Sequence, residues 1–182
     1  MKTKTLWSSI AFIGSIGIAN AAPVQNPANG HWYDFINTGS IDWNTAKNQA
    51  ESLTYLDLSG HLATISDADE NAFLYTNVSS ALGYLGATDE LTEGTWQWVT
   101  GESFSYTNWA VEEPNNCCGG ESYLMTWENG TWNDIFNNSG YTSSYFVEYE
   151  AVSAIPVPGA VWLFGSAILG LIGFGRRNRK QA

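Results

Sequence analysis

The chain has 182 residues, a length that suits one domain with targeting segments better than two domains. All 18 acidic residues lie between Asp34 and Glu150, and Lys47 is the single cation in that span. This excess of negative charge argues against nucleic acid as a partner, because the phosphate backbone would be repelled. It favours cations, although acidity alone also keeps an exported protein soluble.

The N-terminus has the order of a secretory signal peptide, residues 1–21. A short basic segment comes first, an apolar run covers residues 6–18, and Ala19-Asn20-Ala21 fits the small-x-small pattern of a cleavage site. The sequence therefore predicts an exported protein whose mature chain begins with a short segment, residues 22–29.

The C-terminus carries a second uncharged apolar stretch, residues 159–175, followed by the basic residues of 176–182. At about 1.5 Å per residue this stretch is at the short limit for a transmembrane helix. Pro156 and Pro158, in the linker 151–158, would keep such a helix from extending backwards. The basic tail is expected on the cytoplasmic side.

Pro156-Val157-Pro158, an apolar helix and an arginine cluster together resemble a PEP-CTERM sorting signal, with Val157 in place of the usual acid. The resemblance implies processing by an exosortase-type enzyme of a Gram-negative bacterium. It also implies a final location at the cell surface or in the extracellular matrix of exopolysaccharide. A plain membrane anchor that is never cleaved is the alternative.

The central domain, residues 30–150, begins with two predicted helices. Apolar residues recur at helical spacing after Asp42, which predicts a first helix over residues 41–53. Ser66, followed three residues later by Asp69, reads as the N-cap of a second helix that extends to about Thr76.

Short aromatic strands and turns are expected beyond Gly83. They cover residues 95–99, 145–149, and two segments, 123–127 and 132–135, that flank a hairpin turn at Asn129-Gly130. Residues 104–120 form a polar loop that is too long for a simple hairpin, and long ordered loops commonly carry function. Two helices first and strands later indicate an α+β fold.

Five side chains in and after this loop could hold a hard cation: Glu113, Asn115, Glu121, Asn133 and Asp134. They supply three carboxylates and two amides, and Ca²⁺ takes six to eight oxygen ligands, so positions remain open for a ligand. Each hydroxyl of a sugar diol has two acceptor lone pairs and one proton. Two acid–amide pairs match two such hydroxyls, and Asp134 remains as a dedicated metal ligand.

At these residues the chain resembles the C-type lectin family. Glu113-Pro114-Asn115 matches the family's long-loop motif, and residues 60–65 and 84–87 match two further landmarks. The resemblance implies two helices, small antiparallel sheets, a long calcium-binding loop and a cis bond before Pro114. It also implies mannose-, glucose-, fucose- or N-acetylglucosamine-type glycans as ligands, held by Glu113, Asn115, Glu121 and Asn133.

An auxiliary metal site of this family has two matching acids here, Asp89 and Glu93. The other matching positions hold Asn116 and Ser122, so half the expected charge is missing. The resemblance therefore implies at most a weak second metal site at Asp89, Glu93 and Asn116.

The positions that match the family's usual half-cystines hold other residues, which are Ala50, Tyr123, Asn137 and Val147. The two actual cysteines, Cys117 and Cys118, are adjacent inside the long loop and cannot join distant segments. A vicinal disulfide that stiffens the loop, intermolecular bridges and a free thiol pair are the alternatives.

Two other classes of function compete with sugar binding. An enzyme is disfavoured, because His31 and His61 are the only histidines and neither lies in a recognisable nucleophile setting. A non-sugar, protein-binding adhesive or structural module would use the same loop. The sequence names neither the sugar nor the oligomeric state.

Overall fold

The computed structural model of the protein describes residues 21–150. Two α-helices lie in this part of the chain, α1 (Trp43–Ser52) and α2 (Ala68–Phe73), and a π-helical turn, Leu74–Val78, continues α2. The strands are β1 (Val24–Gln25), β2 (Trp32–Asn37), β3 (Thr54–Tyr55), β4 (Leu58–Leu62), β5 (Tyr84–Thr88), β6 (Gln97–Trp98), β7 (Tyr123–Thr126), β8 (Trp132–Ile135) and β9 (Ser144–Glu150). The architecture is α+β, as the sequence predicts.

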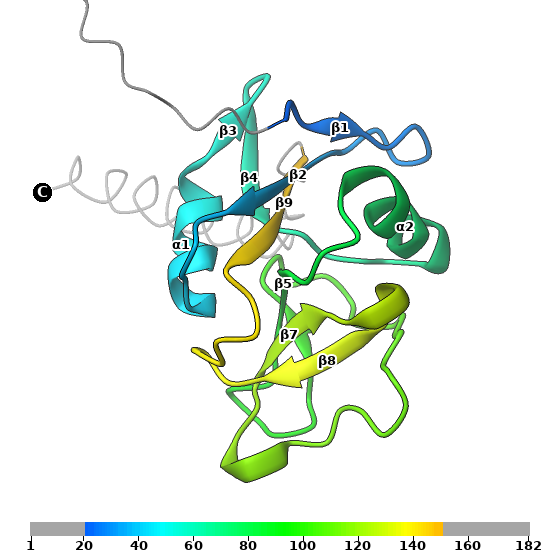
Figure 1. The fold of residues 1–182 in the computed structure, drawn as a ribbon. Helices are drawn as coiled ribbons and strands as arrows, with labels where there is room; N and C mark the ends of the chain where they lie inside the picture. The colour runs from blue at the N-terminus through cyan, green and yellow to red at the C-terminus, as the bar shows by residue number, and fades with distance from the viewer. Residues whose placement is uncertain (1–20, 151–182) are drawn as a thin grey trace, which may run out of the picture. The chain divides into compact units, whose positions relative to one another are not determined.

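The last strand, β9, is the centre of the sheet. β2 pairs with it antiparallel along six residue pairs, and β4 pairs with it antiparallel along four. Figure 1 shows the blue β2 directly beside the yellow-orange β9, with α1 and α2 on opposite sides of this pair. The expectation that strands follow the helices is therefore incomplete, because β1 and β2 precede α1. Their partners are remote in sequence, and β2 shows no regular alternation of buried and exposed residues.

A second part of the sheet carries the long loop. β5 joins β9 in parallel at Tyr84↔Tyr145, and the order continues through β7 to β8. β7 and β8 form the predicted hairpin, with left-handed backbone at Asn129 (φ 59°) and Gly130 (φ 75°). The segment predicted as a strand at residues 95–99 is shorter in the structure, where β6 covers two residues.

Both predicted helices form, with one correction at the second. Asp42 caps α1, because its side chain accepts a hydrogen bond from Thr45 N at 2.8 Å. The N-cap of α2 is Asp67, which accepts from Glu70 N at 2.9 Å, and the prediction of Ser66 is wrong. The Ser66 hydroxyl donates instead to Glu70 Oε2 at 2.8 Å, which satisfies an acid that is only 5% exposed.

Two hydrophobic clusters form the core. In the first, Ala50 of α1 and Val147 of β9 are fully buried, so apolar packing occupies two positions that the resemblance matches to half-cystines. The second surrounds Trp132, whose indole meets the rings of Trp98, Tyr106 and Trp109 edge-on. Trp132 opens β8, so this cluster fixes the strand that carries Asn133 and Asp134.

No helix within residues 21–150 is long and apolar enough to cross a bilayer. The predicted signal peptide up to Asn20 lies outside the described residues, as do the linker 151–158, the transmembrane helix 159–175 and the basic tail 176–182. These four assignments remain predictions.

Candidate functional site

Asp134 on β8 holds the middle of the long loop in place. Asn115 N donates to Asp134 Oδ1 at 3.1 Å, and Asn116 N donates to Asp134 Oδ2 at 2.8 Å. Asp134 is 1% exposed and pairs with Leu124 across the hairpin. A buried strand residue therefore sets the position of the loop segment that follows Pro114. The Glu113–Pro114 bond is cis, as the resemblance implies.

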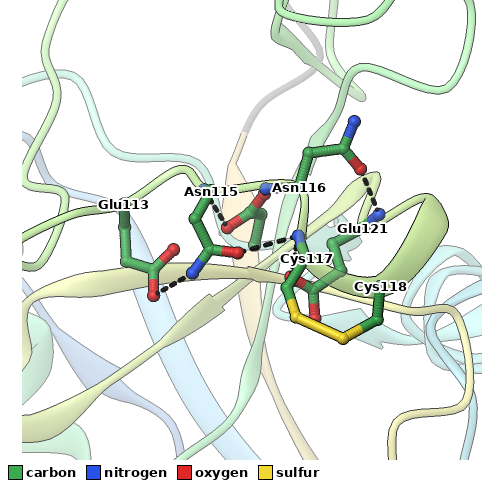
Figure 2. The surroundings of a disulfide bond; sticks show 7 residues. Glu113, Asn115, Asn116, Cys117, Cys118 and Glu121 are labelled. Atoms are coloured by element: carbon green, nitrogen blue, oxygen red, sulfur yellow. Dashed lines mark hydrogen bonds between the residues drawn. A yellow bond between two sulfur atoms is a disulfide. The ribbon is translucent and has the colours of Figure 1, made fainter.

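Further hydrogen bonds close the loop between Asn115 and Glu121, as Figure 2 shows. Asn115 Nδ2 donates to Glu113 Oε1 at 2.9 Å. Cys117 N donates both to Asn115 Oδ1 at 2.8 Å and to Glu121 Oε2 at 2.9 Å. Asn116 Oδ1 accepts from Glu121 N at 2.9 Å, which joins the two ends of the segment.

Four of the five predicted metal ligands thus share one hydrogen-bond network: Glu113, Asn115, Glu121 and Asp134. No hydrogen bond within the described residues links the fifth, Asn133, to this network, and its place is beside Asp134 on β8. Asn116, which the sequence predicts only for the weak second metal site, also belongs to this network, and the main-chain amide of Cys117 is a member that the sequence does not predict. The only sequence signal for their part in the network is the turn-forming composition of Asn116 to Gly120.

Unsatisfied oxygens gather at this site. Five buried side-chain atoms in the described part of the chain lack a hydrogen-bond partner, and three of them are oxygens of the predicted ligand sets: Glu113 Oε2, Asn133 Oδ1 and Asp89 Oδ1. Buried oxygens without a donor are costly, so a native protein rarely leaves them unpaired. Their concentration here indicates a cation or a bound donor.

The acids of the site repel one another. Partial burial and the neighbouring Asp134 carboxylate raise the pKa of Glu113 to about 7. The same two causes raise the pKa of Glu121. A cation placed among these carboxylates would remove the repulsion and favour the ionised forms. The donor set, all hard oxygen, therefore fits Ca²⁺ and gives no preference for a soft transition metal.

The residues of the predicted weak second site also lie near this network. Asp89 Oδ2 accepts from Gly94 N at 2.8 Å, and its other oxygen is the unpaired one noted above. Partial desolvation and the carboxylates of Asp89 and Asp134 raise the pKa of Glu93. Asn116 is already engaged, since its Oδ1 accepts from Glu121 N. The second site therefore stays a prediction.

The two cysteines form a disulfide with each other, Cys117–Cys118, and this selects one of the three states that the sequence left open. Both side chains are exposed on a short 3₁₀ turn, Cys117–Gly119. The bridge joins neighbours, so it acts on the loop and not on distant parts of the fold.

A separate polar cluster lies where β2, β9 and α2 meet. His31 Nδ1 contacts Glu148 Oε1 at 2.6 Å, and His31 Nε2 lies 3.3 Å from Glu150 Oε2. The Tyr33 hydroxyl lies between Glu70 and Glu148, at 3.0 Å from Glu148 Oε1. These contacts tie the segment that enters β2 to the last strand. His61 adjoins the same cluster, since its Nε2 faces Glu150 Oε1 at 3.4 Å.

This cluster makes stability depend on pH. The hydrogen bond to Glu148, opposed by burial, gives His31 a pKa above the ordinary 6.5. The stabilisation from protonated His31 is complete below pH 6.5 and is lost as the pH rises through the raised folded-state pKa. We expect the free energy of unfolding, measured in chelator by urea titration, to fall as the pH rises from about 6 to about 8.5. His31→Gln should make this fall shallower.

The test is the difference between the wild type and His31→Gln in how the free energy of unfolding depends on pH. Glu113, with a pKa of about 7, adds a slope of the same sign in both proteins, because deprotonation exposes its repulsion from Asp134. The difference between wild type and His31→Gln removes that contribution. Parallel curves over the whole range would contradict a role for His31 in the pH dependence.

Comparison with known proteins identifies the family. The model of the "Lectin C-type domain" matches residues 40–147. Halomucin of Haloquadratum walsbyi is 31% identical over an alignment of 153 positions, and the alignment covers 75% of this chain and 2% of that protein. The low affinity immunoglobulin epsilon Fc receptor of Mus musculus is 32% identical over 124 residues, which are 68% of this chain and 36% of that protein. The chain thus spans a minor part of both relatives.

Solved structures share the fold. The C-type carbohydrate-recognition domain of cow CD23, determined in the presence of a GlcNAc2Man3 oligosaccharide, has 28% identity and a TM-score of 0.59, over 68% of this chain and 90% of that chain. The EPNH mutant of CEL-I, a C-type lectin from Cucumaria echinata, has 26% identity and a TM-score of 0.61. The match covers 74% of this chain and 99% of that chain. A calcium-independent type II antifreeze protein has 17% identity and a TM-score of 0.60, over 74% and 95%, which shows the fold alone.

Members of this family often bind Ca²⁺, yet calcium-independent relatives exist, so the fold does not by itself decide the metal. The family binds ligands and is not enzymatic, which agrees with the absence of a nucleophile setting around His31 or His61. The two helices, the mixed sheet centred on β9 and the match over residues 40–147 lead to one assignment. The chain belongs to the C-type lectin domain family.

Proposed function

We propose that the chain is a calcium-dependent carbohydrate-binding protein of the mannose type. One observation carries the proposal: buried oxygens of Glu113 and Asn133 lack donors beside three mutually repelling carboxylates. A hard cation would satisfy these oxygens and neutralise the carboxylates. Glu113, Asn115, Glu121, Asn133 and Asp134 would hold it.

Calcium, when bound, would offer open coordination positions to two neighbouring hydroxyls of a sugar. The chain's own residues supply the remaining hydrogen bonds. Asn115 Nδ2 and Glu113 Oε1, now paired at 2.9 Å, present one donor and one acceptor side by side. A hydroxyl can accept from the amide and donate to the carboxylate, so this pair recognises one hydroxyl completely. Glu121 and Asn133 would form the second pair.

The order of acid and amide bears on selectivity. Glu113 precedes Asn115, so the acid comes before the amide in this pair. In the family this order accompanies mannose-, glucose-, fucose- and N-acetylglucosamine-type diols, whereas Gln-Pro-Asp accompanies galactose. The first three letters of the EPNH designation match Glu113-Pro114-Asn115, and the cow CD23 structure was determined with a mannose-containing oligosaccharide. The first fact shows that the motif occurs in another lectin structure, and the second supports a mannose-containing glycan as the ligand.

The sequence of the terminal segments supports a proposal about where the protein acts. We propose that the protein is exported, is anchored through residues 159–175 and is then processed by an exosortase-type enzyme. A sugar-binding domain at the cell surface or in an exopolysaccharide matrix would meet polymeric glycans, for which several copies give useful avidity. Mass spectrometry of the cell-associated protein would locate both cleavage points, and an uncut C-terminus would leave the plain anchor.

The test uses the full chain in a detergent without a sugar headgroup, passed over immobilised mannose and immobilised galactose in calcium. We expect retention on mannose alone and release by chelator or by free mannose. Asn115→Asp should reduce retention on mannose by roughly tenfold or more, because the amide donor to the sugar hydroxyl is lost. The binding constant for mannose, measured by a frontal-affinity series, gives the size of this loss.

Asn48→Asp is the matched control, since Asn48 is exposed on α1 and the substitution adds the same charge away from the loop. Retention on neither column, together with a calcium-dependent rise in Tm, would contradict mannose as the ligand and leave another glycan or a protein in its place. No change of Tm with calcium would contradict the metal site itself.

A further inference from the structure

The vicinal disulfide lies inside the proposed binding loop, between two of the proposed metal ligands. Asn115 precedes Cys117 by two residues, and Glu121 follows Cys118 by three. Figure 2 shows the disulfide below the main chain that joins the two ligands. Both cysteine side chains are exposed, so small molecules can reach the bond.

The main-chain amide of Cys117 is the contact through which this segment reaches the ligands. It donates to Asn115 Oδ1 at 2.8 Å and to Glu121 Oε2 at 2.9 Å. A single N–H thus orients one amide and one carboxylate that belong to different acid–amide pairs. Any movement of Cys117 would change both pairs together.

The backbone around the Cys117 amide adopts conformations that are unfavourable or loosely constrained, so it does not by itself hold the amide in place. Asn116 (φ 46°) and Cys118 (φ 60°) are non-glycine residues in the left-handed region, which L-residues seldom occupy. Gly119 and Gly120 follow and add conformational freedom. The disulfide closes a small ring that contains the peptide bond between the two cysteines, so it restricts the backbone at Cys117 and Cys118.

We propose that the Cys117–Cys118 disulfide is a positioning element of the binding loop and makes ligand binding sensitive to thiol reductants. This inference rests on the proposed function. A dithiol reductant transfers two electrons to the bond: the S–S bond breaks, each cysteine sulfur takes up a proton, and the dithiol becomes a disulfide. The released Cys117 amide then no longer holds Asn115 and Glu121 in one arrangement.

A structural staple would behave differently from a positioning element. A disulfide stabilises a fold mainly by closing a long segment of the unfolded chain, and here no residue lies between the partners. Reduction should therefore leave the Tm in chelator nearly unchanged, while the loop loses its order. The two readouts separate local positioning from global stability.

The experiment compares the oxidised full chain, the chain reduced with dithiol and then freed of it, and the double variant C117S/C118S. The sequence has no other cysteine, so any effect of the reductant arises at this pair, and the double variant must not respond to it. Calcium affinity is measured by calorimetry, Tm in chelator by scanning calorimetry, and amide hydrogen exchange of residues 115–121 in calcium-free protein by mass spectrometry.

We expect the Kd for calcium to rise by about tenfold or more on reduction, as for the loss of an outer contact that orients a metal ligand. Exchange at residues 115–121 should accelerate, and C117S/C118S should match the reduced chain. Equal calcium affinity and equal exchange in the oxidised and reduced chains would overturn the proposal, as would two free thiols in the protein purified without reductant.

Failure of the proposed function has its own signature. If the oxidised chain binds no calcium, that function is wrong, and hydrogen exchange alone then decides the positioning. Faster exchange confined to residues 115–121 after reduction would support it, and unchanged exchange would overturn it.

Discussion

Replacement of Asp134 by asparagine should raise the Kd for calcium by roughly 100-fold, because ligand charge sets the affinity of such sites. The two Asp134 oxygens accept from Asn115 N and Asn116 N, and an asparagine side chain offers one oxygen for both. The substitution therefore removes a metal ligand and loosens the loop at once. Calorimetric titration with calcium measures the loss, and retention on mannose should disappear with it.

Asp57→Asn is the control for this prediction. Asp57 is exposed in the turn between β3 and β4, so the substitution removes the same charge without touching the loop. Calcium affinity should then stay within about twofold of wild type, since exposed and distant charges are largely screened. An Asp134→Asn protein that binds calcium as tightly as the control would place the metal elsewhere.

Truncation of Trp132 to alanine should lower the free energy of unfolding in chelator by about 3–5 kcal/mol. The side chain is fully buried and lies at the centre of the second core cluster. Its Nε1 donates to Asn71 Oδ1 at 2.8 Å, so truncation also leaves a polar partner unpaired. Urea denaturation in chelator isolates this loss from any contribution of bound calcium.

Leu91→Ala gives the matched comparison, because Leu91 is 85% exposed and its truncation should change stability by less than about 0.5 kcal/mol. Since Trp132 begins β8, the alanine variant should also bind calcium more weakly than wild type. A loss below about 1 kcal/mol would show that the aromatic cluster repacks around the gap.

Local patterns in the sequence account for the elements that were predicted well. The helical spacing of Trp43, Ala46 and Ala50 gives α1 to within two residues at either end, since a helix forms from contacts three and four positions apart. The turn signal Asn129-Gly130 gives the β7–β8 hairpin, because the two strands are joined directly by this short turn. Both elements depend on residues that are neighbours in sequence, so the sequence of one chain is enough to predict them.

The strand β2 was not predicted, and neither were the partners of the predicted strand β9, because their pairing joins segments that are remote in sequence. β2 is held by β9 more than a hundred positions later, for example at Phe35↔Phe146. His31 and Glu148 are likewise separated by 117 positions, and the sequence around either residue does not predict the contact. Pairing over such distances is decided by the packing of the whole domain.

Residue types and their spacing were enough to predict an acidic domain, five oxygen-bearing side chains at lectin spacing and an α+β fold. The arrangement of these side chains depends on the folded domain. It places Asp134 as the anchor of the loop, makes the Cys117 amide the link between Asn115 and Glu121, and pairs the cysteines. Residue type fixes which atoms can donate or accept, whereas only the folded backbone fixes which of them meet.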